Sequence, residues 1–83
     1  MSKTENLRAA LKQDVAELER LRDEIKLRVH LAGMDAKSAW RELEPRVDAV
    51  EQSVTAEGNE VKDATVHLAR EMRDALARFR ARL

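Results

Sequence analysis

The chain has 83 residues, of which 43% are apolar and 39% are charged, and it contains no cysteine. The missing cysteines exclude disulfides, thiolate metal sites and thiol nucleophiles. Sixteen basic residues balance sixteen acidic ones, which excludes a whole-molecule field that would attract nucleic acid or an anionic membrane. This length and composition are typical of one small all-α domain, which we expect to span residues 1–83.

The first expected helix begins near residue 3, because Ser2 and Glu5 have the spacing of a capping box. Apolar residues then recur at steps of three and four, as one face of a helix requires. These residues are Leu7, Leu11, Val15, Leu18, Leu21 and Ile25. No apolar signal region or membrane-spanning run is found, so we expect a cytoplasmic protein.

Three positions can interrupt the helical pattern further along the chain. Gly33 and Gly58 each cost about 1 kcal/mol inside a helix, whereas Pro45 costs about 3 kcal/mol. Gly58 followed by Asn59 is the strongest turn signal, since it combines a helix stop with an N-cap residue.

An apolar stripe with an eleven-residue period runs from Ala10 to Leu83. Of its 18 positions between Leu21 and Leu83, 14 hold Ala, Val, Ile, Leu or Met. This period is close to that of a straight helix, so it predicts long helices that pack along one face.

Two arrangements fit both the stripe and the breaks. A turn between Glu44 and Pro45, or no turn at all, gives a helical hairpin or long amphipathic helices in a coiled-coil assembly. Turns near 33–35 and 57–59 give a compact three-helix bundle. Because the stripe keeps its phase through every break, we expect the first arrangement, with the three-helix bundle as the alternative.

The stripe and its flanks supply the expected packing and oligomer interface. Trp40 is its strongest anchor, because large aromatic residues contribute disproportionately to association. The predicted interface residues are Leu21, Ile25, Trp40, Leu43, Val47, Val50, Val54, Val61, Met72, Leu76 and Phe79. We therefore expect a homo-oligomer or a complex with another helical protein.

Charge is distributed unevenly along the chain. Residues 42–63 carry seven acids against two bases, and residues 64–83 carry five arginines against two acids. We expect the acidic residues 42–63 to lie alongside a basic segment. The opposite charges would then determine the register in which the two segments pack. The basic C-terminal segment also predicts an alternative contact, with the phosphates of anionic lipid or nucleic acid. The predicted anion-binding residues are Arg73, Arg78, Arg80 and Arg82.

No catalytic constellation is recognisable in the sequence. Neither His30 nor His67 has a glutamate three residues before it, which excludes the Glu-x-x-His pairs of di-iron bundles. His67 has Asp63 and Glu71 at helical spacing, which we interpret as a solvated charged face. The serines have no histidine at useful spacing, and two isolated glycines cannot build a phosphate loop. We therefore predict no enzyme, no cofactor and no metal site.

The segment 21–40 resembles a stretch found in small bacterial helical proteins. The similarity lies in residues 21–27, 30–32 and 34–37 and in Trp40. The eleven-residue period is also similar to that of apolipoprotein-like and desiccation-protein helices, which contact lipid. Neither resemblance implies a catalytic residue. The sequence thus predicts a structural or interaction protein that self-associates, with peripheral binding of anionic lipid or nucleic acid as the alternative.

Overall fold

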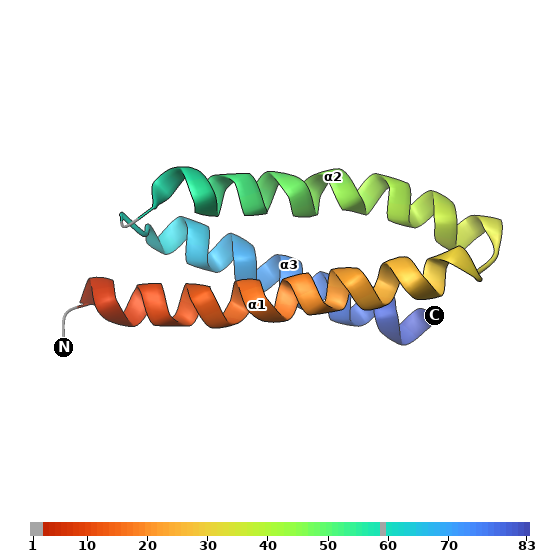
Figure 1. Ribbon diagram of the computed structural model, residues 1–83, viewed down its shortest axis with the longest axis horizontal. Helices are drawn as coiled ribbons and strands as arrows, with labels where there is room; N and C mark the ends of the chain where they lie inside the picture. Colours follow the sequence, from red (N-terminus) through yellow and green to blue (C-terminus); the bar gives the residue numbers. More distant parts are fainter. Residues whose placement is uncertain (1–2, 59) are drawn as a thin grey trace.

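The computed structural model describes residues 3–58 and 60–83, with side chains from residue 5 onward. Over these ranges the chain forms three helices, α1 (Lys3–His30), α2 (Met34–Glu57) and α3 (Asp63–Arg82), and no strand. The helices run up, down and up, so α1 and α3 point the same way and α2 points the opposite way (Figure 1). The predicted all-α class is confirmed, and the three-helix alternative describes the arrangement.

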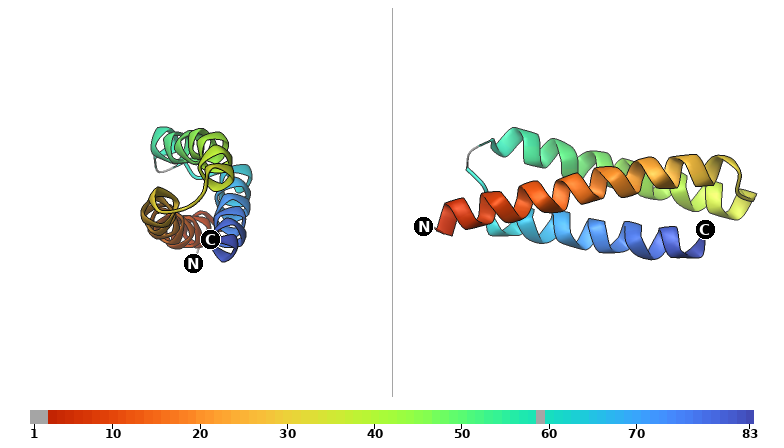
Figure 2. Two further views of the ribbon diagram at one scale, coloured as in Figure 1. Left: turned by 90° about the vertical axis from the view of Figure 1, so that its right-hand side faces the viewer. Right: turned by 60° about the horizontal axis from the view of Figure 1, so that its bottom comes forward.

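The bundle is elongated, with extents of 47 × 19 × 15 Å along its principal axes. Most of the contacts between helices join α1 to α3, and α2 packs less closely against both (Figure 2). Among the three helices, α2 is therefore the most loosely packed.

The core takes one apolar face from each helix. Leu18, Ile25, Val47 and Leu76 are completely covered. The other buried apolar residues are Leu11, Leu21 and Val29 on α1, Trp40 and Val50 on α2, and Val66 and Ala69 on α3. Burying each of the larger side chains stabilises the fold by about 1.5–3 kcal/mol.

The first turn spans residues 31–33, close to the position that Gly33 predicts. After His30, the next two backbone N–H groups donate to carbonyls three residues earlier, at 3.1 and 3.0 Å. These bonds satisfy carbonyls that the end of α1 would otherwise leave unpaired. Gly33 then precedes α2 as its N-cap residue, with an extended backbone (φ −72°, ψ 174°).

Pro45 lies inside α2, so the predicted turn between Glu44 and Pro45 is wrong. Proline lacks an N–H group and leaves the carbonyl of Arg41 without its helical partner. Pro45 is on an exposed side of the helix, where water can reach that carbonyl. Trp40 and Val47 are buried on either side of it, and their packing holds the helix together.

The second turn spans residues 58–62 and confirms Gly58 as a helix stop, with a positive φ of 58°. After this turn, α3 begins at Asp63 with Lys62 as its N-cap residue. The helix start near residue 3 is confirmed. Asn59 itself lies outside the described residues, as does Ser2 of the expected capping box.

The two glycines should respond differently to alanine. Gly58→Ala is expected to lower the free energy of unfolding by about 1–2 kcal/mol, because a Cβ disfavours positive φ. Gly33→Ala should change it by less than about 0.5 kcal/mol, since its φ is ordinary and an added Cβ meets nothing within 4 Å. Urea unfolding followed by circular dichroism measures both values. Equal losses would contradict a special backbone requirement at Gly58.

Candidate interaction surface

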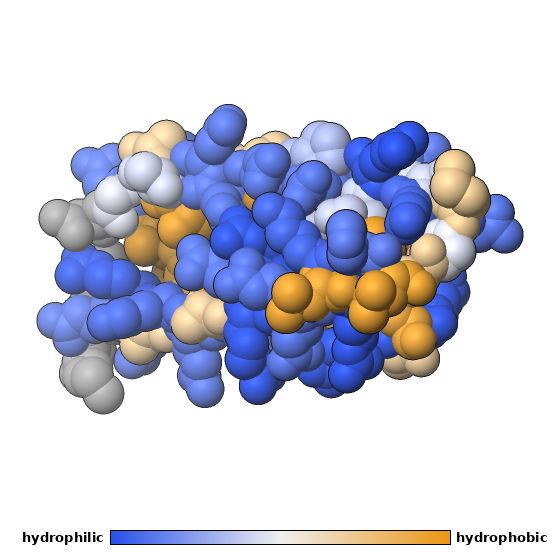
Figure 3. All heavy atoms as spheres, turned by 45° about the vertical axis from the view of Figure 1, so that its right-hand side comes forward, coloured by the Kyte–Doolittle hydropathy of each residue, from blue (hydrophilic) through white to orange (hydrophobic). Residues whose placement is uncertain are grey.

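Three large apolar side chains are largely exposed at the end of the bundle where α1 turns into α2, and Leu83 after α3 is 37% exposed. Leu27 is 74% exposed, Leu31 88% and Met34 69%. Figure 3 shows hydrophobic surface near this end, set among hydrophilic side chains. We refer to Leu27, Leu31 and Met34 as the apolar strip. Grouped exposure of this kind marks interaction sites on small proteins.

Helix geometry explains why Leu27 is left out of the core. Ile25 and Val29 are buried and lie two residues before and after Leu27. Two helical residues turn the side-chain direction by about 200°, so Leu27 points to the opposite side of α1. Leu31 follows one turn later, beyond the end of the helix, and Met34 is the first residue of α2. The apolar strip therefore faces away from the core.

Positive charge is concentrated at the same end of the bundle. Residues 26–41 carry four cations against Asp35. Residues 76–83 carry three cations and no acid, and α3 ends beside the turn between α1 and α2 (Figure 1). We call residues 26–41 and 76–83 the basic end.

Two ion pairs between helices neutralise part of the basic end. Arg80 Nη1 lies 2.7 Å from Glu24 Oε2, and the hydrogen bond that it donates is the main cause that lowers the pKa of Glu24. Lys26 Nζ lies 3.4 Å from Glu44 Oε2. Within the described part of the chain, the other five cations of this end make no ion pair, and all of them except the half-buried Lys37 are exposed. They are Arg28, Lys37, Arg41, Arg78 and Arg82.

The residues predicted to form the oligomer interface lie in and around the core of a single copy. Leu21, Ile25, Trp40, Val47, Val50 and Leu76 are buried, and Leu43, Val54, Val61, Met72 and Phe79 are half-buried and packed against the same core. Trp40 and Phe79 join α2 to α3, with ring centroids 5.9 Å apart. The faces that the stripe marks thus meet one another inside one molecule.

The four arginines predicted to bind anions differ in their surroundings. Arg73 and Arg80 on α3 form ion pairs with acids of α1. Arg78 and Arg82 are exposed and, among the residues described, have no acidic partner. Only these last two are open to an external anion.

A buried carboxylate that the sequence pattern did not single out joins α1 to α3. The Asp14 side chain is 6% exposed and forms an ion pair with Arg73, while Arg70 Nε lies 3.5 Å from its Oδ2. Arg73 also lies 3.0 Å from Asp74. The hydrogen bond to Asp74, aided by the charge of Asp14, raises the pKa of the Arg73 guanidinium.

A signal for this ion pair is present in the sequence. Asp14 comes three residues after Leu11 and four residues before Leu18, and both leucines are buried. It therefore occupies a position on the core face of α1, where a carboxylate needs a hydrogen-bonded or charged partner. Asp14 also lies eleven residues before Ile25, so it occupies a position of the eleven-residue period that a charged residue fills.

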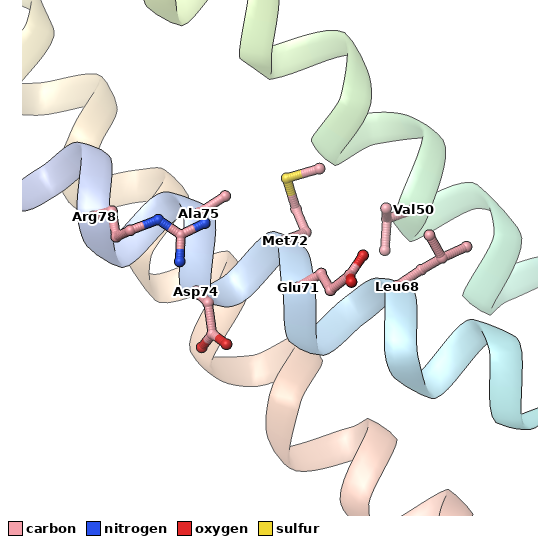
Figure 4. A pocket seen from close by; sticks show the side chains of 7 residues that line it. All are labelled: Val50, Leu68, Glu71, Met72, Asp74, Ala75 and Arg78. Atoms are coloured by element: carbon pink, nitrogen blue, oxygen red, sulfur yellow. The ribbon is translucent and has the colours of Figure 1, made fainter.

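Two grooves with apolar residues flank α2. One of about 440 Å³ lies between α2 and α3, and in Figure 4 Met72 reaches toward α2 while Asp74 points away from it. Its lining is Val50, Leu68, Glu71, Met72, Asp74, Ala75 and Arg78. The other, of about 370 Å³, lies between α1 and α2, and we call it the α1–α2 groove. Its lining is Arg8, Leu11, Lys12, Val15, Ala16, Glu19, Val54, Gly58 and Val61.

The histidines and acids do not gather into a metal-binding cluster in the described ranges. His67 Nε2 lies 2.9 Å from Glu71 Oε1, one helical turn away, and both side chains are exposed. In the same ranges, no helix has the length and hydropathy needed to cross a membrane.

Comparison of the chain with protein-family models, with curated proteins and with solved structures gives no match.

Proposed function

We propose that this protein is a non-catalytic interaction module that self-associates through the apolar strip. The observation that supports the proposal is the exposure of Leu27, Leu31 and Met34, each at least 69% open to solvent. Burying a large apolar side chain is worth about 1.5–3 kcal/mol. A partner that covers all three side chains therefore gains several kcal/mol before the entropic cost of association.

The contact surface in this proposal differs from the one that the eleven-residue stripe predicts. Apart from the exposed Leu83, the large residues of the stripe are already buried or half-buried in one copy, as Val47 and Leu76 illustrate. A second copy would reach them only by opening the bundle. The apolar strip lies on the outer side of α1 and at the start of α2, so a partner can cover it without any rearrangement.

Sedimentation equilibrium tests the proposal. We expect the average mass of the wild type to exceed 9.5 kDa and to rise with concentration into the high micromolar range. The double variant Leu27→Ser/Leu31→Ser should remain monomeric, because it removes most of the exposed apolar surface. Its helicity should be unchanged, since neither side chain contributes to the core.

Leu68→Ser provides a matched control, because Leu68 is 48% exposed but lies on α3, away from the apolar strip. This variant should associate like the wild type. A wild type that stays at 9.5 kDa throughout the concentration range would contradict the proposal.

The basic end supports a second candidate function, peripheral binding to an anionic lipid surface. Each cation near such a surface contributes about 1 kcal/mol, and five cations of this end are free of ion pairs in the described structure. The apolar strip would enter the headgroup region. Cosedimentation with phosphatidylserine vesicles, compared with phosphatidylcholine vesicles, tests this candidate. Absence of binding at low salt would eliminate it.

A further inference from the structure

The two ends of the bundle carry opposite charge. The basic end has seven cations against one acid. At the other end, residues 48–63 have five acids against Lys62, and residues 5–19 have four acids against two cations. We call residues 5–19 and 48–63 the acidic end. The charges cancel in the total but are separated along the 47 Å length of the bundle.

This separation of charge disfavours contact between the apolar strips of two copies. Such a contact would bring two basic ends together, with Arg28, Lys37 and Arg41 of each copy near those of the other. Like charges that face one another across an interface oppose association. The strip meets opposite charge when it contacts the acidic end of a second copy.

The acidic end also contains a recess that apolar side chains can enter. The apolar lining of the α1–α2 groove consists of Leu11, Val15, Ala16, Val54 and Val61. Gly58 lines the groove at the second turn, and its neighbours in that part of the chain include Glu57 and Glu60. Arg8 and Lys12 on the α1 side have long aliphatic stems that can line the groove while their charged groups reach solvent.

From these features we infer that copies of this protein assemble head to tail, with the apolar strip of one copy in the α1–α2 groove of the next. The inference rests on the proposed self-association and adds the surface that receives the strip. The two surfaces differ and lie in opposite halves of the bundle. Every bound pair therefore keeps one free strip and one free groove, and the assembly can grow.

Two single substitutions block one surface each and leave the core intact. Leu31→Asp places an acid in the apolar strip at a position that is 88% exposed. Ala16→Arg fills the groove from an exposed position on α1. Leu68→Asp and Ala49→Arg introduce the same side chains at exposed positions outside both surfaces, and they serve as matched controls.

Sedimentation velocity at high micromolar concentration measures the result. We expect the wild type and both controls to form species larger than a dimer, and Leu31→Asp alone and Ala16→Arg alone to sediment as monomers. An equal mixture of these two variants should form a complex of two copies and nothing larger. The reason is that the Ala16→Arg copy keeps its strip and the Leu31→Asp copy keeps its groove. High salt should weaken the complex, because it screens the charges of the two ends.

Several outcomes would overturn the inference. If Ala16→Arg associates as the wild type does, the surface that receives the strip lies elsewhere. If the wild type forms a dimer and nothing larger, the two apolar strips contact each other. A mixture that stays monomeric would also refute it. A monomeric wild type contradicts the proposed self-association itself. If that monomer binds phosphatidylserine vesicles and Leu31→Asp does not, the occupant of the strip is lipid.

Discussion

Replacing Trp40 with alanine is expected to lower the free energy of unfolding by about 3–5 kcal/mol. Trp40 is 6% exposed and is the largest of the three buried side chains of α2, with Val47 and Val50. The centroid of its ring lies 5.9 Å from that of Phe79, and this contact packs α2, the least closely packed helix, against α3. A small domain has about 5–15 kcal/mol of stability in total, so the variant retains a narrow margin.

Urea unfolding at low protein concentration, followed by circular dichroism, measures this loss. Trp40→Phe keeps an aromatic ring beside Phe79 and should lose less than about 2 kcal/mol. An anchor that acted between copies, as the sequence predicts for Trp40, would behave differently. Its removal would change the sedimenting mass and leave the stability of the monomer unchanged.

Local signals in the sequence are sufficient for the helices but not for the choice among their breaks. By helix propensity alone, Pro45 is a costlier interior residue than Gly33, at about 3 against 1 kcal/mol. The chain nevertheless turns at Gly33 and continues through Pro45. Trp40 and Val47 are buried on either side of Pro45, and their burial outweighs its cost. Such a tertiary gain is not visible in a comparison of propensities.

The eleven-residue period describes the buried faces only in part. Ala39 is one of its positions, yet its side chain is exposed. Alanine satisfies an apolar pattern without having to be buried, so the stripe overstates how far one face continues. In α2, Leu43, Val47, Val50 and Val54 are stripe positions that pack in the core, but the buried residue one turn earlier is Trp40 and not Ala39.

The apolar strip could not be predicted from the same pattern. Leu27 and Leu31 lie outside the stripe, and a leucine off the main face of a helix is not unusual in a sequence. Their exposure depends on how α2 returns along the bundle after the turn at 31–33, which leaves the outer side of α1 uncovered. That path is a property of the whole fold.

The buried ion pair between α1 and α3 should respond asymmetrically to mutation. Arg73→Met is expected to lower the free energy of unfolding by about 3 kcal/mol, because it leaves the buried carboxylate of Asp14 without its main partner. The loss falls at the lower end of the usual range, since Arg70 remains 3.5 Å from Asp14 Oδ2. Urea unfolding at neutral pH and low protein concentration measures the change.

The reciprocal variant, Asp14→Leu, should change the stability by less than about 1 kcal/mol, and it is the control for this interpretation. Arg73 is 26% exposed and keeps its contact with Asp74, so losing the acid does not leave a buried, unpaired charge. The double variant Asp14→Leu/Arg73→Met should recover most of the loss caused by Arg73→Met. Equal losses in both single variants would contradict this account. With the expected asymmetry, the pair adds little net stability and instead restricts α1 and α3 to the one register in which Asp14 meets Arg73.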